Sequence, residues 1–192
     1  MPSDSILLVM DMINDLVDPD GPGAKTYGVT CRERNVYENT AQAIERARGA
    51  GIMIGYVRIG FSSDYRECPV ASPAFSKARE NGIFKLGSWG TEVYSRFAPR
   101  GEDADIVKHR VSPFYGTALA PLLSARGIRR LLLTGVSTNG VVSAAVREGH
   151  DRDFHCVVLE DCCAGATGDE HASALAGLRR YATIATAASF DP

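Results

Sequence analysis

The sequence has no excess of charge of one sign and no long apolar run. Its 192 residues carry 21 Lys and Arg against 23 Asp and Glu, for a formal net charge of −2. This balance provides no basic footprint for nucleic acid or for an anionic membrane surface. The longest apolar runs, such as residues 6–10, fall far below the roughly 20 residues that a membrane span requires. We therefore expect a small-molecule substrate and no nucleic-acid or membrane partner.

The sequence also lacks the cysteine spacing of a disulfide framework or of a metal site. The five cysteines are Cys31, Cys68, Cys156, Cys162 and Cys163. Their number is odd, their spacing is irregular, and the adjacent pair at 162–163 is not a CxxC half-site. This usage favours a reducing compartment, so we expect a cytoplasmic protein without a signal peptide.

Length and composition predict one domain of ordinary globular character. A chain of 192 residues with 45% hydrophobic residues is long enough to bury a sizeable core. No internal repeat, low-complexity tract or linker interrupts it. We expect a single domain over residues 1–192.

Short apolar runs rich in Val, Ile and Leu alternate with helical patterns along the chain. The predicted strands are residues 6–11, 51–58, 105–108, 130–135, 154–159 and 182–186, and the predicted helices are residues 32–50, 117–126, 140–152 and 170–181. Such alternation is typical of a mostly parallel sheet that is covered by helices on both faces. The pattern predicts an α/β fold but leaves the order of the strands open.

One connection, residues 59–100, is too rich in proline and glycine to be a single crossover helix. It contains Pro69, Pro73, Pro99 and the one tryptophan, Trp89. Long connections in compact domains usually serve a binding site or an interface. We expect this segment to form a wall or lid of the site, or a contact between copies of the chain.

Charged side chains stand where several predicted strands end. Asp11 ends the first strand, Arg58 the second and Lys108 the third, and the turn 135–140 follows the fourth. Ligands of open parallel sheets bind beyond the carboxyl ends of the strands, so these groups are expected to meet in one crevice. Each group alone is more often a cap or a solvated charge; together they indicate an acid–base site for a small anionic or carbonyl-bearing substrate.

Three segments of the sequence resemble successive blocks of the isochorismatase-like hydrolase superfamily. They are residues 7–15, 107–119 and 132–140, in the order and spacing of the family, and the resemblance extends over essentially the whole chain. It implies a three-layer α/β/α sandwich with a six-stranded, mostly parallel sheet. It also implies that Asp11 and Lys108 are catalytic.

The resemblance implies a nucleophilic cysteine only in the amidase members, and here Val141 stands at that position. An isopropyl side chain cannot act as a nucleophile. The isochorismatases, in which an Asp acts on a vinyl ether without that thiol, show that the family does not always need it. Some members also carry an Asp-x-His metal site, but residues 56–64 contain no histidine, so we expect neither a metal nor a cofactor.

The remaining site candidates are expected to bind substrate. They are Arg58, Phe61, Trp89, Phe114, Ser137, Asn139, Gly140 and Val141. Arg58 suits a carboxylate but equally a surface salt bridge, and Phe114 is equally credible in the core. By resemblance, the turn offers backbone amides next to a cis peptide between Val136 and Ser137. His171 is expected on the face of a helix.

These observations leave three functions open. The first is a hydrolase that works by non-covalent acid–base chemistry with Asp11 and Lys108, as in the hydrolysis of a vinyl ether. The second is a member that binds a small molecule or acts as a scaffold without turnover. The third is an amidohydrolase that cleaves a C–N bond with a relocated thiol, for which Cys162 and Cys163 are the candidates. In each case the resemblance implies a homo-oligomer, either a dimer or a tetramer.

Overall fold

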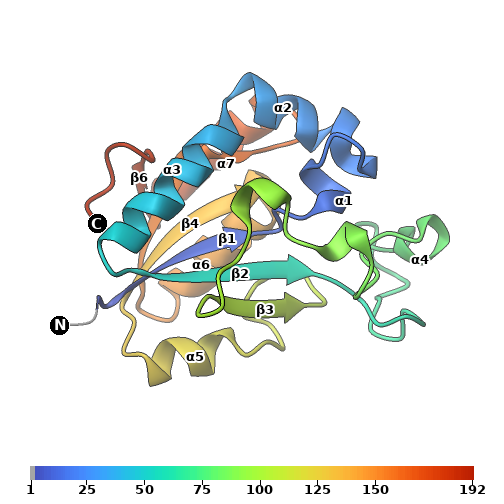
Figure 1. Ribbon diagram of the computed structural model, residues 1–192, viewed down its shortest axis with the longest axis horizontal. Helices are drawn as coiled ribbons and strands as arrows, with labels where there is room; N and C mark the ends of the chain where they lie inside the picture. The colour runs from blue at the N-terminus through green and yellow to red at the C-terminus, as the bar shows by residue number, and fades with distance from the viewer. Residues whose placement is uncertain (1–2) are drawn as a thin grey trace.

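The computed structural model describes residues 3–192, so the first two residues of the expected domain lie outside it. Its centre is a six-stranded sheet in the order β3-β2-β1-β4-β5-β6, visible in Figure 1. The strands are β1 (Ser5–Met10), β2 (Met53–Ile59), β3 (Ala104–Lys108), β4 (Arg130–Val136), β5 (His155–Ala164) and β6 (Thr183–Ala185). All neighbouring strands pair in parallel. The predicted six-stranded α/β fold is confirmed.

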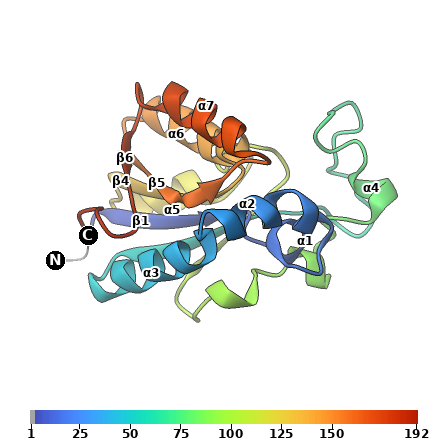
Figure 2. The same ribbon diagram turned by 90° about the horizontal axis from the view of Figure 1, so that it is seen from above.

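Helices cover both faces of the sheet, as the view from above in Figure 2 shows. The longer helices are α2 (Tyr27–Glu33), α3 (Val36–Gly49), α5 (Leu119–Ala125), α6 (Ser143–His150) and α7 (Gly168–Leu178), and the single turns α1 (Asn14–Val17) and α4 (Ala78–Asn81) complete the set. The α3 helix packs on one face, whereas α5, α6 and α7 pack on the other. No helix among the described residues is long and apolar enough to cross a membrane.

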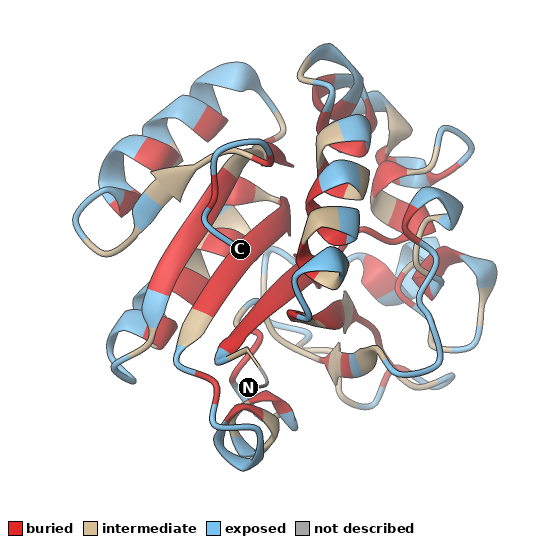
Figure 3. Cartoon of the chain, turned by 60° about the vertical axis from the view of Figure 1, so that its left-hand side comes forward, coloured by how far each residue is buried: buried red, intermediate tan, exposed pale blue. Residues whose placement is uncertain are grey.

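The first strand shows why the apolar runs are continuous rather than alternating. All six residues of β1 are buried. Leu7 and Val9 belong to the core on the α3 side, and Ile6, Leu8 and Met10 belong to the core on the α5–α7 side. A strand covered on both faces needs apolar side chains at every position. Figure 3 shows the resulting buried centre of the sheet.

Two predicted elements differ from those in the structure. The helix expected over residues 32–50 is divided into α2 and α3 at Asn35, whose backbone has a left-handed conformation with φ of 54°. The strand expected to end at residue 159 runs on to Ala164. Cys162 and Cys163 therefore lie inside a buried strand and do not follow it.

The connection between β2 and β3 contains only short helical turns, in agreement with its broken sequence. These are α4, Trp89–Thr91 and Ser95–Phe97. The segment forms a small core of its own, in which Phe61, Phe75 and Phe84 pack with Ile13 and Ile59. This core lies next to the carboxyl end of β2.

The strand order determines where a crevice can form. The chain crosses from β1 to β2 and β3 on one side, and then returns to β4 on the other side of β1. At such a switch point, the connections after two adjacent strands leave in opposite directions and open a crevice beyond the carboxyl ends. In this protein the switch lies between β1, which precedes Asp11, and β4, which ends at Val136.

Candidate active site

Asp11 follows β1 directly and is held from two sides. Its own N–H donates to the carbonyl of Val57 over 2.7 Å, and its Oδ1 accepts the N–H of Ile59 over 2.8 Å. Its backbone has a left-handed φ of 57°, which turns the chain out of the sheet. The carboxylate is thus fixed beside the end of β2, and only 7% of its side chain is exposed.

Lys108 ends β3 and contacts Asp11 across the end of β2. Its Nζ lies 2.7 Å from Oδ2 of Asp11 and donates to the carbonyl of Arg110 over 3.1 Å. Only 2% of the lysine side chain is exposed. Because Lys108 is in register with Ile59 of β2, the sheet itself brings the two charges from distant parts of the sequence together.

Burial sets the protonation behaviour of Asp11. Removal from water raises the pKa of this carboxyl above its ordinary value, and the charge of Lys108 and the hydrogen bonds from Lys108 and Ile59 oppose the rise. The net direction is upward because desolvation is the largest effect. Asp11 therefore holds a proton closer to neutral pH than an exposed aspartate does.

The turn after β4 provides the opposite side of the crevice. The peptide bond between Val136 and Ser137 is cis, and residues 138–142 form one wide helical turn that leads into α6. The carbonyl of Ser137 accepts the N–H groups of Gly140 and Val142 over 3.1 and 3.3 Å. Only glycine fits at position 135, because a Cβ there would overlap the carbonyl oxygen of Met10.

These groups enclose a crevice of about 190 Å³ with a mainly apolar lining. It is lined by Asp11, Leu16, Tyr27, Ile59, Ala74, Phe75, Phe84, Lys108, Val111, Val136, Ser137, Gly140 and Val141. Small-molecule sites are typically apolar with a few fixed polar groups. Here the fixed polar groups are the Asp11–Lys108 pair and the turn.

Five of the predicted site residues thus lie together: Asp11, Lys108, Ser137, Gly140 and Val141. Arg58 does not line the crevice. Side chains alternate along a strand, so Arg58 is directed away from the crevice that its neighbour Ile59 lines. Its guanidinium binds both carboxylate oxygens of Asp105, at 2.8 and 2.6 Å.

Four other predicted substrate contacts also lie elsewhere. Phe61 is fully buried, with its ring packed edge-on against Phe75, and Phe114 is in the core on the α5–α7 side. Trp89 is 48% exposed and lies outside the crevice lining. Asn139 points toward Glu170, with Nδ2 3.5 Å from the carboxylate. The positions of these four side chains depend on how the loops run, and local sequence patterns do not determine that.

Several crevice residues had no individual signal in the sequence. Phe75 and Phe84 come from the long connection, which was expected to form a wall, but their part in that wall depends on how the segment folds. Tyr27 opens α2, and Val111 follows β3. Each is an ordinary apolar or aromatic residue, and only the tertiary structure selects it.

No cysteine lines the crevice as the structure describes it. Cys163 lies beside Gly135 in the sheet, but it is fully buried and its Sγ donates to the carbonyl of Leu159 over 3.3 Å. Burial raises the pKa values of the Cys162 and Cys163 thiols far above the ordinary value. Residues 3–192 also contain no group of three or more His, Cys, Asp or Glu placed to hold a metal ion.

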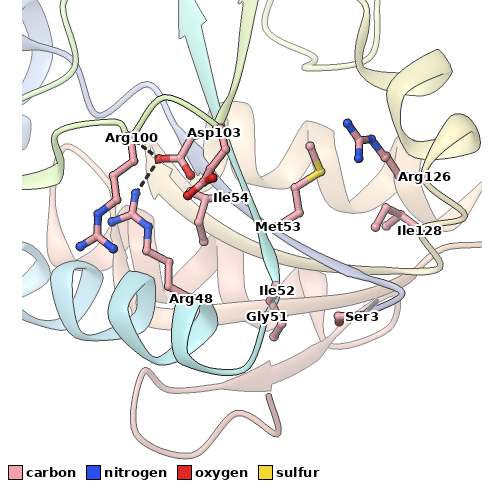
Figure 4. Close-up of a pocket in the computed structure, with 11 residues that line it drawn as sticks. Ser3, Arg48, Gly51, Ile52, Met53, Ile54, Arg100, Asp103, Arg126 and Ile128 are labelled. Atoms are coloured by element: carbon pink, nitrogen blue, oxygen red, sulfur yellow. Dashed lines mark hydrogen bonds and ion pairs between the residues drawn. The ribbon is translucent and has the colours of Figure 1, made fainter. Parts of the chain in front are cut away.

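A larger cavity, of about 530 Å³, lies at the other end of the strands, on the side where they begin (Figure 4). It is bordered by Arg48 and Asp103, whose charged groups are 2.5 Å apart, and by Arg126 across an apolar floor that includes Met53. It is located where β2 and β3 begin. Because ligands of parallel sheets bind at the carboxyl ends, the smaller crevice with Asp11 is the better candidate for the active site.

Comparisons with known proteins give matches over nearly the whole chain. The family model described as the isochorismatase domain matches residues 5–189. A ureidoacrylate amidohydrolase, RutB, of Acinetobacter baylyi is 31% identical over 174 residues, which cover 84% of this chain and 71% of the relative. The family match therefore includes all six strands and the crevice.

Solved structures share the fold at lower sequence identity. An isochorismatase family protein from Desulfovibrio vulgaris superposes with a TM-score of 0.86 at 23% identity, over 97% of this chain and 95% of that one. An N-carbamoylsarcosine amidase from Thermoplasma acidophilum gives a TM-score of 0.77 at 24% identity, over the full length of both chains. These likenesses show the shared fold, and the family match over residues 5–189 shows that the chain belongs to the isochorismatase-like hydrolases.

Proposed function

We propose that this hydrolase acts on a small carboxylated or carbonyl-bearing metabolite by non-covalent acid–base chemistry. Asp11 moves the proton, and Lys108 holds negative charge on the substrate. The observation that carries the proposal is the buried pair, 2.7 Å between Nζ and Oδ2, at the wall of a crevice whose lining contains no thiol.

Asp11 has the properties of a general acid. A carboxyl whose pKa is raised by burial retains a proton nearer to neutral pH and can deliver it in the transition state. With a vinyl ether, the proton passes from Oδ to the terminal carbon and leaves an oxocarbenium ion. Water adds to this ion, the resulting hemiketal releases the alcohol to leave a ketone, and the proton lost returns to Asp11.

Lys108 is placed to bind the polar end of the substrate. An ammonium has three N–H donors, of which one contacts Asp11 and one the carbonyl of Arg110. The third is available for a carboxylate or for an oxygen on which charge develops. The rings of Phe75, Phe84 and Tyr27 line the remainder of the crevice, so the rest of the substrate is expected to be small and partly apolar.

A second candidate is hydrolysis of a C–N bond, which the 31% identity to a ureidoacrylate amidohydrolase favours. A relocated thiol for that reaction has no support from the geometry. Cys162 and Cys163 are fully buried, and burial raises the pKa values of both thiols. An amide substrate would then have to use the same Asp11 and Lys108 pair without a covalent intermediate.

The test is a panel of vinyl ethers, amides and ureido acids assayed with wild type, Asp11→Asn and iodoacetamide-treated enzyme. We expect turnover of one class, its loss in Asp11→Asn, and no effect of iodoacetamide on the wild type. Val141→Cys is the matched control, because it places a thiol in the crevice and should make the enzyme sensitive to alkylation.

Three outcomes would contradict the proposal. Full activity of Asp11→Asn would show that Asp11 is not the general acid. Inactivation of the wild type by iodoacetamide, with protection by substrate, would indicate a thiol enzyme. A ligand that raises the melting temperature but yields no product over hours would indicate a binding protein.

We also propose a homo-oligomer in a reducing compartment such as the cytoplasm. All five cysteines are free thiols, which supports such a compartment.

The proposed oligomer rests on exposed apolar side chains. Val70 and Trp89 of the long connection are 88% and 48% exposed, and an interface between copies would cover them. Light scattering on the purified protein tests the oligomer, and a monomeric mass at all concentrations would contradict it.

A further inference from the structure

A series of polar side chains extends from the turn of the crevice to the surface on the far side of that turn. It starts at Thr138, which is fully buried and whose Oγ1 lies 2.8 Å from Nδ1 of His171. The other ring nitrogen, Nε2, lies 3.5 Å from Oε2 of Glu160 and makes no hydrogen bond to any described residue. The same carboxylate oxygen accepts a hydrogen bond from Arg34 over 2.7 Å. His171 lies on α7, as the sequence predicted, and is 3% exposed, so this face of the helix is directed into the protein.

The surroundings of His171 favour one position for the proton of its neutral ring. Among the described residues, Nδ1 is the one hydrogen-bond partner of the Thr138 hydroxyl, so the hydroxyl donates and Nδ1 accepts. The hydrogen then resides on Nε2 and faces the Glu160 carboxylate. The opposite tautomer would direct a lone pair at a negative charge. Burial and the charge of Arg34 lower the pKa of His171, against the effect of Glu160, so the ring is neutral at pH 7.

Thr138 connects this series of polar side chains to the crevice. It lies between Ser137 and Gly140, both of which line the crevice, and its carbonyl accepts the hydroxyl of Ser143 over 2.7 Å. The threonine itself is not in the lining. Two hydrogen bonds hold Thr138 on the side away from the crevice. Its side chain contacts His171 of α7, and its carbonyl accepts from Ser143 of α6.

We propose that His171 is a positioning residue for the reaction in the crevice. Through Nδ1 it fixes the hydroxyl of Thr138, and through Thr138 it fixes the backbone of Ser137–Val141 against the substrate. The negative charge of Glu160, 3.5 Å from Nε2, favours the tautomer with the hydrogen on that nitrogen. The role of His171 in catalysis rests on the function proposed above, whereas the hydrogen-bonding arrangement does not.

The arrangement is tested without any substrate. In protein with ¹⁵N-labelled histidine, NMR distinguishes the two neutral tautomers of each ring by the shifts of Nδ1 and Nε2. We expect the His171 signals to show hydrogen on Nε2 from pH 7 to 8, and we expect the same tautomer in Asp11→Asn. Hydrogen on Nδ1, or a charged ring at pH 7, would overturn the proposal.

The positioning role is tested with two variants of His171. Each places a polar amide group near only one of the two ring nitrogens. His171→Asn leaves an amide oxygen near the place of Nδ1, where it can accept from Thr138, whereas His171→Gln reaches only the place of Nε2. With the substrate found in the panel, we expect kcat of His171→Gln to fall about tenfold, the order of one lost hydrogen bond, at nearly constant KM. His171→Asn should keep kcat within about threefold of wild type.

Thr138 provides the matched pair and the safeguard against misfolding. Thr138→Val is nearly isosteric and loses the hydroxyl, so its kcat should fall as in His171→Gln, while Thr138→Ser should retain activity. The double variant His171→Gln/Thr138→Val should be no slower than either single one, because both remove the same contact. Equal kcat in all folded variants, or additive losses in the double variant, would overturn the positioning role even if Asp11→Asn confirms the acid.

Discussion

At the scale of single residues, the Asp11–Lys108 pair makes a prediction about stability as well as activity. Lys108→Met removes the charge that lowers the pKa of Asp11, so that pKa rises further. The folded protein then binds the proton more tightly than the unfolded chain, whose carboxyl titrates near 3.8. The free energy of unfolding therefore falls as pH increases from about 4 through the raised pKa, by about 1.4 kcal/mol for each pH unit between the two pKa values.

The measurement is urea unfolding of Lys108→Met and wild type at several pH values between 4 and 8. The fall should extend to higher pH in the variant than in wild type. Lys77→Met is the control, because Lys77 forms an exposed pair with Glu80, and its pH profile should follow that of wild type. A variant profile parallel to wild type would show that Lys108 does not act on the titration of Asp11.

Gly140 makes a second prediction at the residue scale. A Cβ at this position would lie 2.6 Å from Oγ of Ser137, so Gly140→Ala forces that hydroxyl to rotate and adds a methyl group to the crevice. We expect stability to stay within about 1 kcal/mol of wild type, because a hydroxyl can rotate, and kcat/KM to fall at least about tenfold.

Gly49→Ala is the matched control for this change. A Cβ on Gly49 meets no atom within 4 Å, and the residue is the last of α3. Its activity should be that of wild type, with a gain in stability of up to about 1 kcal/mol. If Gly140→Ala retained full kcat/KM, Ser137 and Gly140 would not contact the substrate.

At the scale of elements, α7 depends on a defined cap. Oγ1 of Thr167 accepts the N–H of Glu170 over 3.1 Å at the start of this helix. Thr167→Ala should lower the free energy of unfolding by about 1 kcal/mol, measured by thermal or urea unfolding. Thr167→Ser keeps the acceptor and should be within about 0.5 kcal/mol of wild type. Equal losses in both variants would show that the cap does not contribute.

The same scale shows where periodicity is sufficient and where it is not. The six strands follow from short runs of Val, Ile and Leu, because burial on both faces demands apolar residues throughout. The break between α2 and α3 escaped prediction because Asn35 is one of few residue types that adopt a left-handed φ at modest cost, and helix patterns on both sides concealed it. The extension of β5 was missed because Glu160 and Asp161 interrupt the apolar run.

At the scale of the whole molecule, the packing predicts the reactivity of the thiols. Cys31, Cys156, Cys162 and Cys163 are buried, and only Cys68 has intermediate exposure. A buried thiol is inaccessible, and burial raises the pKa of Cys156 to about 11. Titration with a thiol reagent should show one reactive group in the native protein and five in denaturant, and two or more fast groups in the native state would contradict this packing.

The local sequence determined the α/β alternation, the ends of all strands except β5 to within about one residue, and the identity of Asp11 and Lys108 as crevice groups. Each of these follows from short-range rules: burial selects apolar runs, and parallel strands end at one edge. Tertiary structure alone decided that β1 lies between β2 and β4, that Arg58 pairs with Asp105 outside the crevice, and that His171 reaches Thr138. These contacts join residues 33 or more positions apart, and their formation depends on the path of the whole chain and not on any pattern within it.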